Sequence, residues 1–173
     1  VIMMAAVCSG AHVIFPTPAG YRGDGVFDNF WKLVERWQVT FIVTVPTAIA
    51  ALMQRPVDAD ISTVKKAFSG SAPLPVELYH RFEKASNVNL IEGYGLTEAT
   101  CLVSINPVDG EKKIGSVGVP FPYCEVRILD CDAEGNILKE CKTDEIGEIC
   151  VYNPGVWSGN TYTEEAKNKG LYA

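Results

Sequence analysis

The feature that most constrains the fold is an alternation of amphipathic helices and short apolar strands over the first 105 of the 173 residues. After a loop at residues 16–25, apolar residues recur at helical steps of three and four, with Asp24 as the expected N-cap. These residues are Phe27, Phe30, Trp31, Val34 and Trp37. Residues 39–45 form a run of β-branched and aromatic residues, which is typical of a strand buried on both faces.

The same alternation continues along the chain. We expect a short strand over 11–15, a helix over 47–54, a strand over 64–68, a helix over 75–86 that begins at Pro75, and a strand over 89–91. Helices and strands that alternate in this way favour an α/β fold, with a largely parallel sheet covered by helices.

The character of the sequence changes near Asn106-Pro107. Short strands are predicted at 125–129 and 147–152, with a turn at 133–136. A last helix is predicted over 164–169, capped by Thr163 and ended by Gly170. We therefore predict two parts, an α/β subdomain over residues 1–105 and a small antiparallel sheet or distorted barrel over 106–173.

Composition narrows the classes of function. The net charge is −6 without a basic cluster, so no nucleic-acid partner is expected, because phosphate binding needs a concentrated basic face. The apolar residues 1–15 are too short to span a bilayer. The six cysteines contain no C-x-x-C pair, and we interpret them as buried, reduced thiols of a cytoplasmic protein.

A loop of small residues, Ser69 to Leu74, follows one of the predicted parallel strands. That edge of the sheet is where open α/β folds bind ligands. Small side chains let a ligand approach the backbone, whose amide and carbonyl groups can read a flat heterocycle. Small-residue loops are common after strands, however, so taken alone this loop is interpreted as structural.

The segment Glu92 to Thr100 is more informative. Two glycines flank Tyr94, so we expect its ring on a tight turn, where it can stack on a base. Thr97 offers a hydroxyl at a predicted helix start, which is a natural place for a phosphate. Glu98 adds a carboxylate that could hold a magnesium ion bridging phosphate oxygens. These three groups, so close together in the chain, indicate a nucleotide site.

Four short segments, taken together, carry a family resemblance. Residues 69–74 read S-G-S-A-P-L, 93–98 read G-Y-G-L-T-E, 115–120 read G-S-V-G-V-P and 147–151 read G-E-I-C-V. In this order they resemble the motifs of the adenylate-forming superfamily, which comprises acyl-CoA synthetases, luciferases and peptide-synthetase adenylation domains. The likeness covers essentially the whole chain and is greatest to an acyl-CoA synthetase.

The resemblance implies a role for each matched residue. The adenine would lie between two walls, formed by Gly70, Ser71, Ala72 and Pro73 on one side and by Glu92, Gly93, Tyr94 and Gly95 on the other. Tyr94 would stack on the base. Thr97 would bind the α-phosphate and Glu98 would ligate Mg²⁺, which makes these two the candidate catalytic residues.

It also implies a reaction in two half-steps. A carboxylate, here from a fatty or related acid, attacks the α-phosphorus of ATP to give acyl-AMP and pyrophosphate. The thiol of CoA then displaces AMP. Magnesium and the threonine hydroxyl would stabilise the charge on the transferring phosphorus. The acyl chain is expected behind the glycine turn, near Pro46, Thr47 and the apolar stretch after Thr100.

Other motifs of the family are expected outside this sequence. The phosphate-gripping loop should lie before residue 1, and the T-G-D motif and the catalytic lysine after residue 173. We therefore interpret the chain as an internal fragment of the large N-terminal domain, inactive alone because adenylation needs groups held in one geometry. Gly159-Asn160-Thr161-Tyr162 also departs from the family's usual G-Y.

Two alternatives stay open at this point. The parent could be an amino-acid-activating domain that loads a carrier protein, which an acidic residue placed to grip an α-amine would distinguish. It could instead be a non-catalytic nucleotide-binding module, although the intact Thr97 and Glu98 argue against a decayed site. The acid, the thiol acceptor and the oligomeric state are left open by the sequence.

Overall fold

The chain forms two compact units in the computed structural model, which describes residues 2–157, 161–169 and 171. The first unit comprises the residues up to 94 together with 105–119. The second comprises residues 95–104 and those from 120 onward. The sequence-based division at residue 105 remains a prediction. The two sheets have the strand orders β1-β2-β3-β4-β5 and β7-β6-β8.

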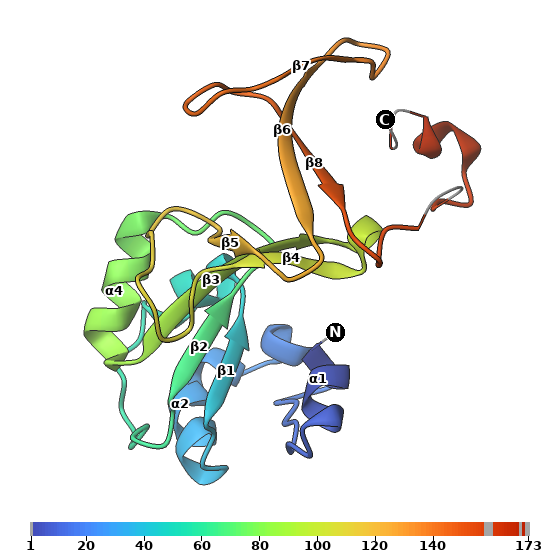
Figure 1. Cartoon of the computed structure of the whole chain (residues 1–173). Helices are drawn as coiled ribbons and strands as arrows, with labels where there is room; N and C mark the ends of the chain where they lie inside the picture. Colours follow the sequence, from blue (N-terminus) through green and yellow to red (C-terminus); the bar gives the residue numbers. More distant parts are fainter. Residues whose placement is uncertain (1, 158–160, 170, 172–173) are drawn as a thin grey trace. The chain divides into compact units, whose positions relative to one another are not determined.

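Helices and strands alternate in the first unit, as predicted (Figure 1). Its elements are α1 (Ile2–Cys8), the 3₁₀ turn η1 (Gly20–Arg22), α2 (Val26–Arg36), β1 (Phe41–Thr44), α3 (Pro46–Leu52), β2 (Lys66–Ser69), α4 (Val76–Ser86) and β3 (Asn89–Leu96), whose last two residues belong to the second unit. β1 pairs with β2 and β2 with β3, both in parallel. The prediction of a largely parallel sheet with covering helices is confirmed.

Two helices of this unit, α3 and α4, have residues at their ends that suit those places. Proline is the first residue of α3, where its fixed φ fits the helix and its missing N–H is not needed. Pro75 immediately precedes α4, and Asn87 ends that helix in the left-handed conformation that asparagine tolerates. The predicted helix over 75–86 is therefore confirmed to within a residue.

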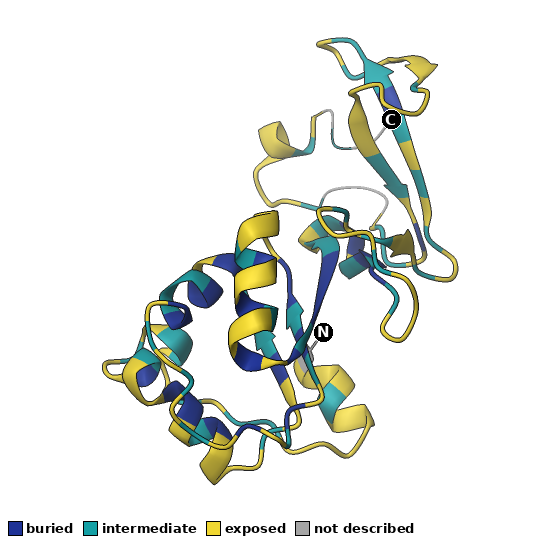
Figure 2. Cartoon of the chain, turned by 90° about the vertical axis from the view of Figure 1, so that its left-hand side faces the viewer, coloured by how far each residue is buried: buried dark blue, intermediate teal, exposed yellow. Residues whose placement is uncertain are grey.

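A single apolar core holds the first unit together. Phe82 of α4, Leu52 of α3 and Leu90 of β3 are 0% exposed, and Trp31 of α2 is 1% exposed. Figure 2 shows the buried residues of these helices on their inner sides and the exposed ones on their outer sides. Burying side chains of this size contributes about 1.5–3 kcal/mol each, so the core fixes the strands whose ends carry the candidate site.

Three details of the first unit differ from the prediction. Residues 11–15 form no strand. Gly25, in the left-handed conformation, takes the N-cap position that was predicted for Asp24. β1 is buried on alternate residues rather than on both faces, with Phe41 exposed and Ile42 buried. An apolar run indicates that a segment is hydrophobic. How many faces of the strand are buried depends on the elements that pack against it.

The second unit is built from turns and short strands. Its elements are η2 (Thr97–Ala99), β4 (Cys101–Ile105), β5 (Val119–Pro120), β6 (Glu125–Cys131), β7 (Ile137–Glu140), β8 (Glu148–Tyr152) and η3 (Glu165–Asn168), with one end residue each of β4 and β5 in the first unit. β6 pairs with β7 and with β8, both antiparallel, which confirms the small antiparallel sheet. The predicted turn at 133–136 is present, because the Asp132 carboxylate accepts hydrogen bonds from the N–H groups of Glu134 and Asn136.

The end of the chain is less regular than predicted. The helix expected over 164–169 is a 3₁₀ turn, Glu165–Asn168, preceded by Glu164 without a side-chain cap, so Thr163 does not cap it. Gly170 and residues 159–160 lie outside the described residues. Within the part of the chain that the structure describes, no helix is long and apolar enough to cross a membrane.

Candidate functional site

The small-residue loop leaves β2 at the carboxyl end of the parallel strands of the first unit. Ser69, the last residue of β2, and Gly70 are both buried, whereas Ser71, Ala72 and Pro73 are exposed. Ser71 has φ = 69°, a left-handed conformation that a serine adopts only when its surroundings fix it. The three exposed residues thus present a fixed backbone at the edge where such sheets bind ligands.

Glu92 ties this loop to β3. The backbone N–H of Leu74 donates a hydrogen bond to Glu92 Oε1 at 3.0 Å, and the Glu92 side chain is buried at 6% exposure. Gly70 lies beside the next residue of β3, because a Cβ added to it would lie 3.4 Å from the Gly93 carbonyl oxygen. The structure therefore brings together the two segments that the sequence assigned to the adenine, at least as far as Gly93.

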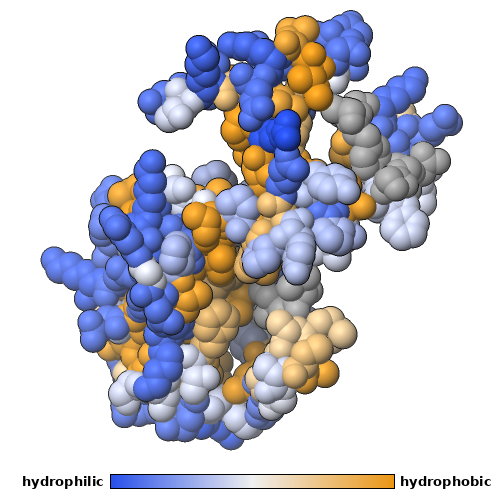
Figure 3. Space-filling model, viewed as in Figure 1, coloured by the Kyte–Doolittle hydropathy of each residue, from blue (hydrophilic) through white to orange (hydrophobic). Residues whose placement is uncertain are grey.

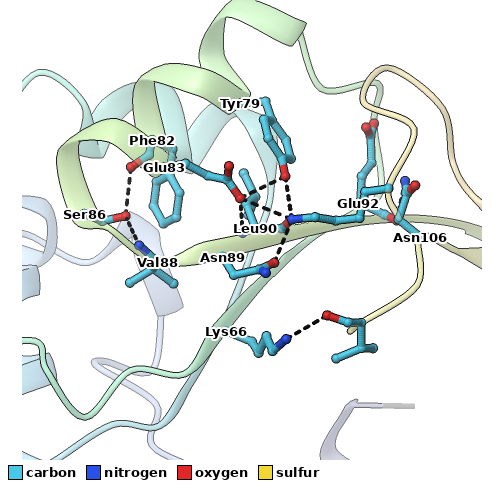
Figure 4. A network of polar contacts seen from close by, with 12 residues as sticks. Lys66, Tyr79, Phe82, Glu83, Ser86, Val88, Asn89, Leu90, Glu92 and Asn106 are labelled. Carbon is cyan, nitrogen blue, oxygen red and sulfur yellow. Dashed lines mark hydrogen bonds and ion pairs between the residues drawn. The ribbon is translucent and has the colours of Figure 1, made fainter. Parts of the chain in front are cut away.

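Asn106 is a third component of this half, and sequence reasoning missed it. Its backbone N–H and its Nδ2 both donate to the Glu92 carbonyl oxygen, at 2.9 and 3.4 Å. Nδ2 also donates to the Ser116 carbonyl, and Oδ1 accepts from the Lys113 N–H at 3.1 Å. Figure 4 shows Asn106 beside Glu92. The sequence marked this asparagine only as the start of a change in character.

A polar network supports the start of β3 (Figure 4). The Tyr79 hydroxyl donates to Glu83 Oε1 at 2.8 Å, and the Lys112 ammonium donates to the Tyr79 oxygen at 2.7 Å and to Asn89 Oδ1 at 2.8 Å. Burial raises the pKa of Glu83, but hydrogen bonds from the Leu90 N–H and the Tyr79 hydroxyl, with the charge of Lys112, outweigh it and leave that pKa lowered. Burial, followed by the bond to Glu83, raises the pKa of Tyr79. Lys112, whose side chain is 16% exposed, is therefore a partly buried anchor of this network rather than a freely solvated charge.

The remaining predicted residues, Gly95, Thr97 and Glu98, belong to the second unit. The tight turn expected around Tyr94 is absent, because β3 continues as a strand to Leu96. Gly95 is required for a different reason: a Cβ on it would lie 1.5 Å from the Cys101 carbonyl oxygen. The glycine thus permits a close approach of two backbones rather than a turn.

Thr97 and Glu98 lie on the short turn η2. The predicted helix start is a single 3₁₀ turn of three residues, so no helix dipole is available to a phosphate, and the hydroxyl of Thr97 is the group that could bind one. Thr97 is exposed and Glu98 is half-buried. Both are therefore accessible from solvent, as ligand-binding side chains must be.

The donor set around Glu98 fits magnesium delivered with a phosphate. Among the described residues no group of three His, Cys, Asp or Glu side chains could hold a metal ion. Mg²⁺ is commonly held by one or two carboxylates together with substrate phosphates and waters, rather than by a cage of protein ligands. One carboxylate beside a threonine hydroxyl is sufficient for that mode of binding.

Comparison with known proteins agrees with these motifs. The model of the family described as "AMP-binding enzyme" matches residues 1–160. A marinolic acid–CoA ligase of Pseudoalteromonas sp. is 34% identical over 154 residues, which are 88% of this chain and 24% of that protein. A long-chain-fatty-acid–CoA ligase of Bacillus subtilis is 35% identical over 130 residues, 74% of this chain and 22% of that protein.

Solved structures of similar proteins extend the comparison. ATP-bound MatB from Rhodopseudomonas palustris superposes with a TM-score of 0.70 at 28% identity, over 84% of this chain and 27% of that one. The anthranilate CoA ligase AuaEII, in complex with anthranoyl-AMP, gives a TM-score of 0.68 at 27% identity, over 84% and 27% of the two chains. The chain spans about a quarter of the length of the curated relatives that it matches.

Proposed function

This chain belongs to the AMP-binding enzyme family, and from that premise we propose that it carries part of the nucleotide site of an ATP-dependent acid–thiol ligase. The substrate would be a carboxylic acid, most consistent with a fatty acid, and the acceptor CoA. The observation that carries the proposal is the hydrogen bond from the Leu74 N–H to Glu92 Oε1, which joins two segments predicted to line one adenine.

The nucleotide would be recognised largely through backbone groups. Ser71, Ala72 and Pro73 are exposed in a loop that is held by the hydrogen bond from the Leu74 N–H to the Glu92 carboxylate. A flat purine can be read by amide and carbonyl groups at its edge while the half-buried Tyr94 stacks on its face. Gly70 lets this loop lie close to β3, because a Cβ on it would lie 3.1 Å from the Phe68 ring and 3.4 Å from the Gly93 carbonyl oxygen.

The chemistry would take place at the α-phosphorus of ATP. A carboxylate oxygen of the acid forms a bond to phosphorus while the bond to the pyrophosphate oxygen breaks, which gives acyl-AMP and pyrophosphate. A thiol sulfur then bonds to the acyl carbon, its proton is lost, and AMP leaves. The Thr97 hydroxyl would donate a hydrogen bond to an α-phosphate oxygen. A donor held at that place stabilises the negative charge that develops in the transition state. Magnesium, held by Glu98 when bound, supplies further charge neutralisation.

Two kinds of support favour this chemistry over a bare nucleotide-binding module. The relatives named above are CoA ligases, and one similar structure was solved with ATP and another with an acyl-adenylate. In addition, Thr97 and Glu98 are both accessible from solvent, as groups in contact with substrate must be. We place the protein in the cytoplasm, where ATP, CoA and reduced thiols are available.

The test is acid-dependent ATP–pyrophosphate exchange by the intact protein that contains this sequence, with short, medium and long fatty acids, aromatic acids and amino acids. We expect exchange with a fatty acid and a loss of about 10²–10³-fold in Thr97→Val and in Glu98→Gln. Thr143→Val and Glu134→Gln, at exposed positions in turns, are the matched controls and should retain full exchange.

Other outcomes would redirect the assignment. Exchange with amino acids alone would identify an amino-acid-activating domain that loads a carrier protein. ATP binding by folded protein without exchange on any acid would identify a non-catalytic nucleotide-binding module. We expect the 173-residue chain by itself to be inactive, because adenylation depends on groups held in one geometry, with effective molarities on the order of 10⁵ M or more.

A further inference from the structure

The turn that follows Glu98 has an unfavourable backbone conformation. Thr100 and Cys101 have φ values of 54° and 92°, so two consecutive non-glycine residues lie outside the ordinary region. A β-branched residue such as threonine is rarely found there, because its Cβ approaches the following carbonyl. Such a conformation persists only when neighbouring contacts determine it.

Thr100 makes two hydrogen bonds that account for its conformation. Its backbone N–H donates to the Thr97 carbonyl at 3.0 Å, which closes the turn η2. Its Oγ1 donates to the carbonyl oxygen of Gly155 at 2.5 Å, and Gly155 lies 55 positions further along the chain. The hydroxyl thus joins the turn that carries Thr97 and Glu98 to the loop that follows β8.

The other side of this contact is adapted to it. A Cβ on Gly155 would lie 2.8 Å from Thr100 Cβ and 3.0 Å from the Ala99 carbonyl oxygen, so a side chain there would push the loop away. The Gly155 N–H donates to Asn153 Oδ1 at 2.7 Å, and Asn153 is buried at 7% exposure. Asn153 Nδ2 in turn donates to Cys124 Sγ at 3.4 Å. The loop that receives the Thr100 hydroxyl is therefore itself anchored.

We propose that Thr100 is a positioning residue, whose hydroxyl fixes the Thr97–Ala99 turn against the 153–155 loop and so holds Thr97 and Glu98 in place for ATP. The proposal rests on the function proposed above for those two side chains. In this role Thr100 acts through the turn and not on the reacting atoms. Its loss would misplace the turn, and a displacement of about 1 Å in such a site can lower the rate about 10²-fold.

Thr100→Val and Thr100→Ser separate the hydroxyl from the rest of the side chain. Valine keeps the β-branched shape and its backbone strain but cannot donate to Gly155, whereas serine keeps the donor. Thr143→Val makes the same substitution at an exposed position of another turn in this unit and is the matched control. Each variant would be studied in the intact protein by two measurements. Amide hydrogen exchange reports on residues 95–104 and 153–157, and the kinetics of ATP–pyrophosphate exchange with MgATP report on activity.

We expect Thr100→Val to speed amide exchange in both segments at least tenfold and to lower kcat about 10- to 100-fold with a smaller change in the KM for ATP. Thr100→Ser should restore both properties, and Thr143→Val should change neither. A role confined to global stability would lower the melting temperature without this split between kcat and KM.

Amide hydrogen exchange and adenylate formation test the positioning role and the proposed function separately. If amide exchange in Thr100→Val equals that of the unmodified protein, the turn is not held by this hydroxyl and the proposal is overturned, whatever the activity. If the unmodified protein forms no adenylate with any acid, the proposed function fails, while amide exchange still decides whether Thr100 joins the two segments. Protected amides combined with a lower kcat would also contradict the positioning role.

Discussion

The two units of this protein fix the candidate residues that each of them carries by different means. In the first unit, the loop 69–74 and the start of β3 rest on a closed apolar core and on buried polar groups such as Glu92 and Asn106. In the second, hydrophobic side chains are largely exposed, with Leu138 at 63% and Ile146 at 98% exposure. Figure 3 shows hydrophobic residues at the surface of the region formed by β6 and β8.

The difference shows that candidate site residues can be held in place either by burial in a core or by a few local hydrogen bonds. The segments proposed to line the adenine are fixed by burial, which makes each supporting residue costly to change. The turn with Thr97 and Glu98 is fixed by single hydrogen bonds, such as that of Thr100, whose loss would leave most of the unit intact. Stability and activity should therefore respond together in the first unit and separately in the second.

The largest expected effect is in the core of the first unit. Phe82→Ala removes a side chain that is fully buried against α2, α3 and β3, and we expect a loss of about 3–5 kcal/mol in the free energy of unfolding. Leu138→Ala in β7 truncates an exposed side chain and should cost less than about 0.5 kcal/mol. Urea unfolding followed by tryptophan fluorescence and circular dichroism measures both. Equal losses would show that the second unit has a core as critical as the first.

An intermediate effect is expected at Asn106. Asn106→Ala leaves the Ser116 carbonyl and the Lys113 N–H without their buried partner, and such unpaired groups cost about 1–3 kcal/mol. The loosened support of Glu92 should also weaken ATP binding, which calorimetry on the intact protein would detect. Asn136→Ala, in the exposed turn between β6 and β7, is the matched change and should leave ATP affinity as it was. Unaltered affinity in Asn106→Ala would show that Glu92 keeps its place without it.

The smallest effect is a pH dependence. The folded pKa of Glu83 is lowered, so its contribution to stability is complete above the ordinary glutamate value of 4.5 and is lost as pH falls through the folded pKa. Glu83→Gln should therefore flatten the fall in melting temperature with acid. The pKa of Glu145 in the second unit is also lowered, chiefly by the Lys142 N–H, but its exposure to solvent should make Glu145→Gln the weaker change. A steeper fall in Glu83→Gln than in the unmodified protein would contradict this sign.

Much of the first unit could be predicted from the sequence because its signals are local. The helical spacing of Phe30, Trp31 and Val34 and the proline before α4 correspond to real elements. The strand β7 and the strand β4 were not predicted, because a strand of four or five partly exposed residues leaves little pattern. Each of these segments is a strand because of the strands it pairs with, rather than because of its own side chains.

The candidate site shows the same division. Four motifs in order, among them the one with Tyr94, Thr97 and Glu98, carried the resemblance to the family, and the family assignment agrees. The role of Gly95 was misjudged, because a glycine chosen for a turn and one chosen for a close backbone approach look identical in a sequence. The contacts of Asn106 and Thr100 could not be predicted, because their partners lie on other segments that folding brings close.

The sequence by itself thus determined the class of fold, the family and the residue types that could meet a nucleotide. Only the tertiary structure decided which backbone groups those residues hold in place, that Lys112 is an anchor rather than a solvated charge, and that Thr100 joins η2 to the loop after β8. The physical reason is that propensity and periodicity are properties of neighbours along the chain. A buried hydrogen bond is a property of two groups that folding alone brings within 3 Å or so of each other.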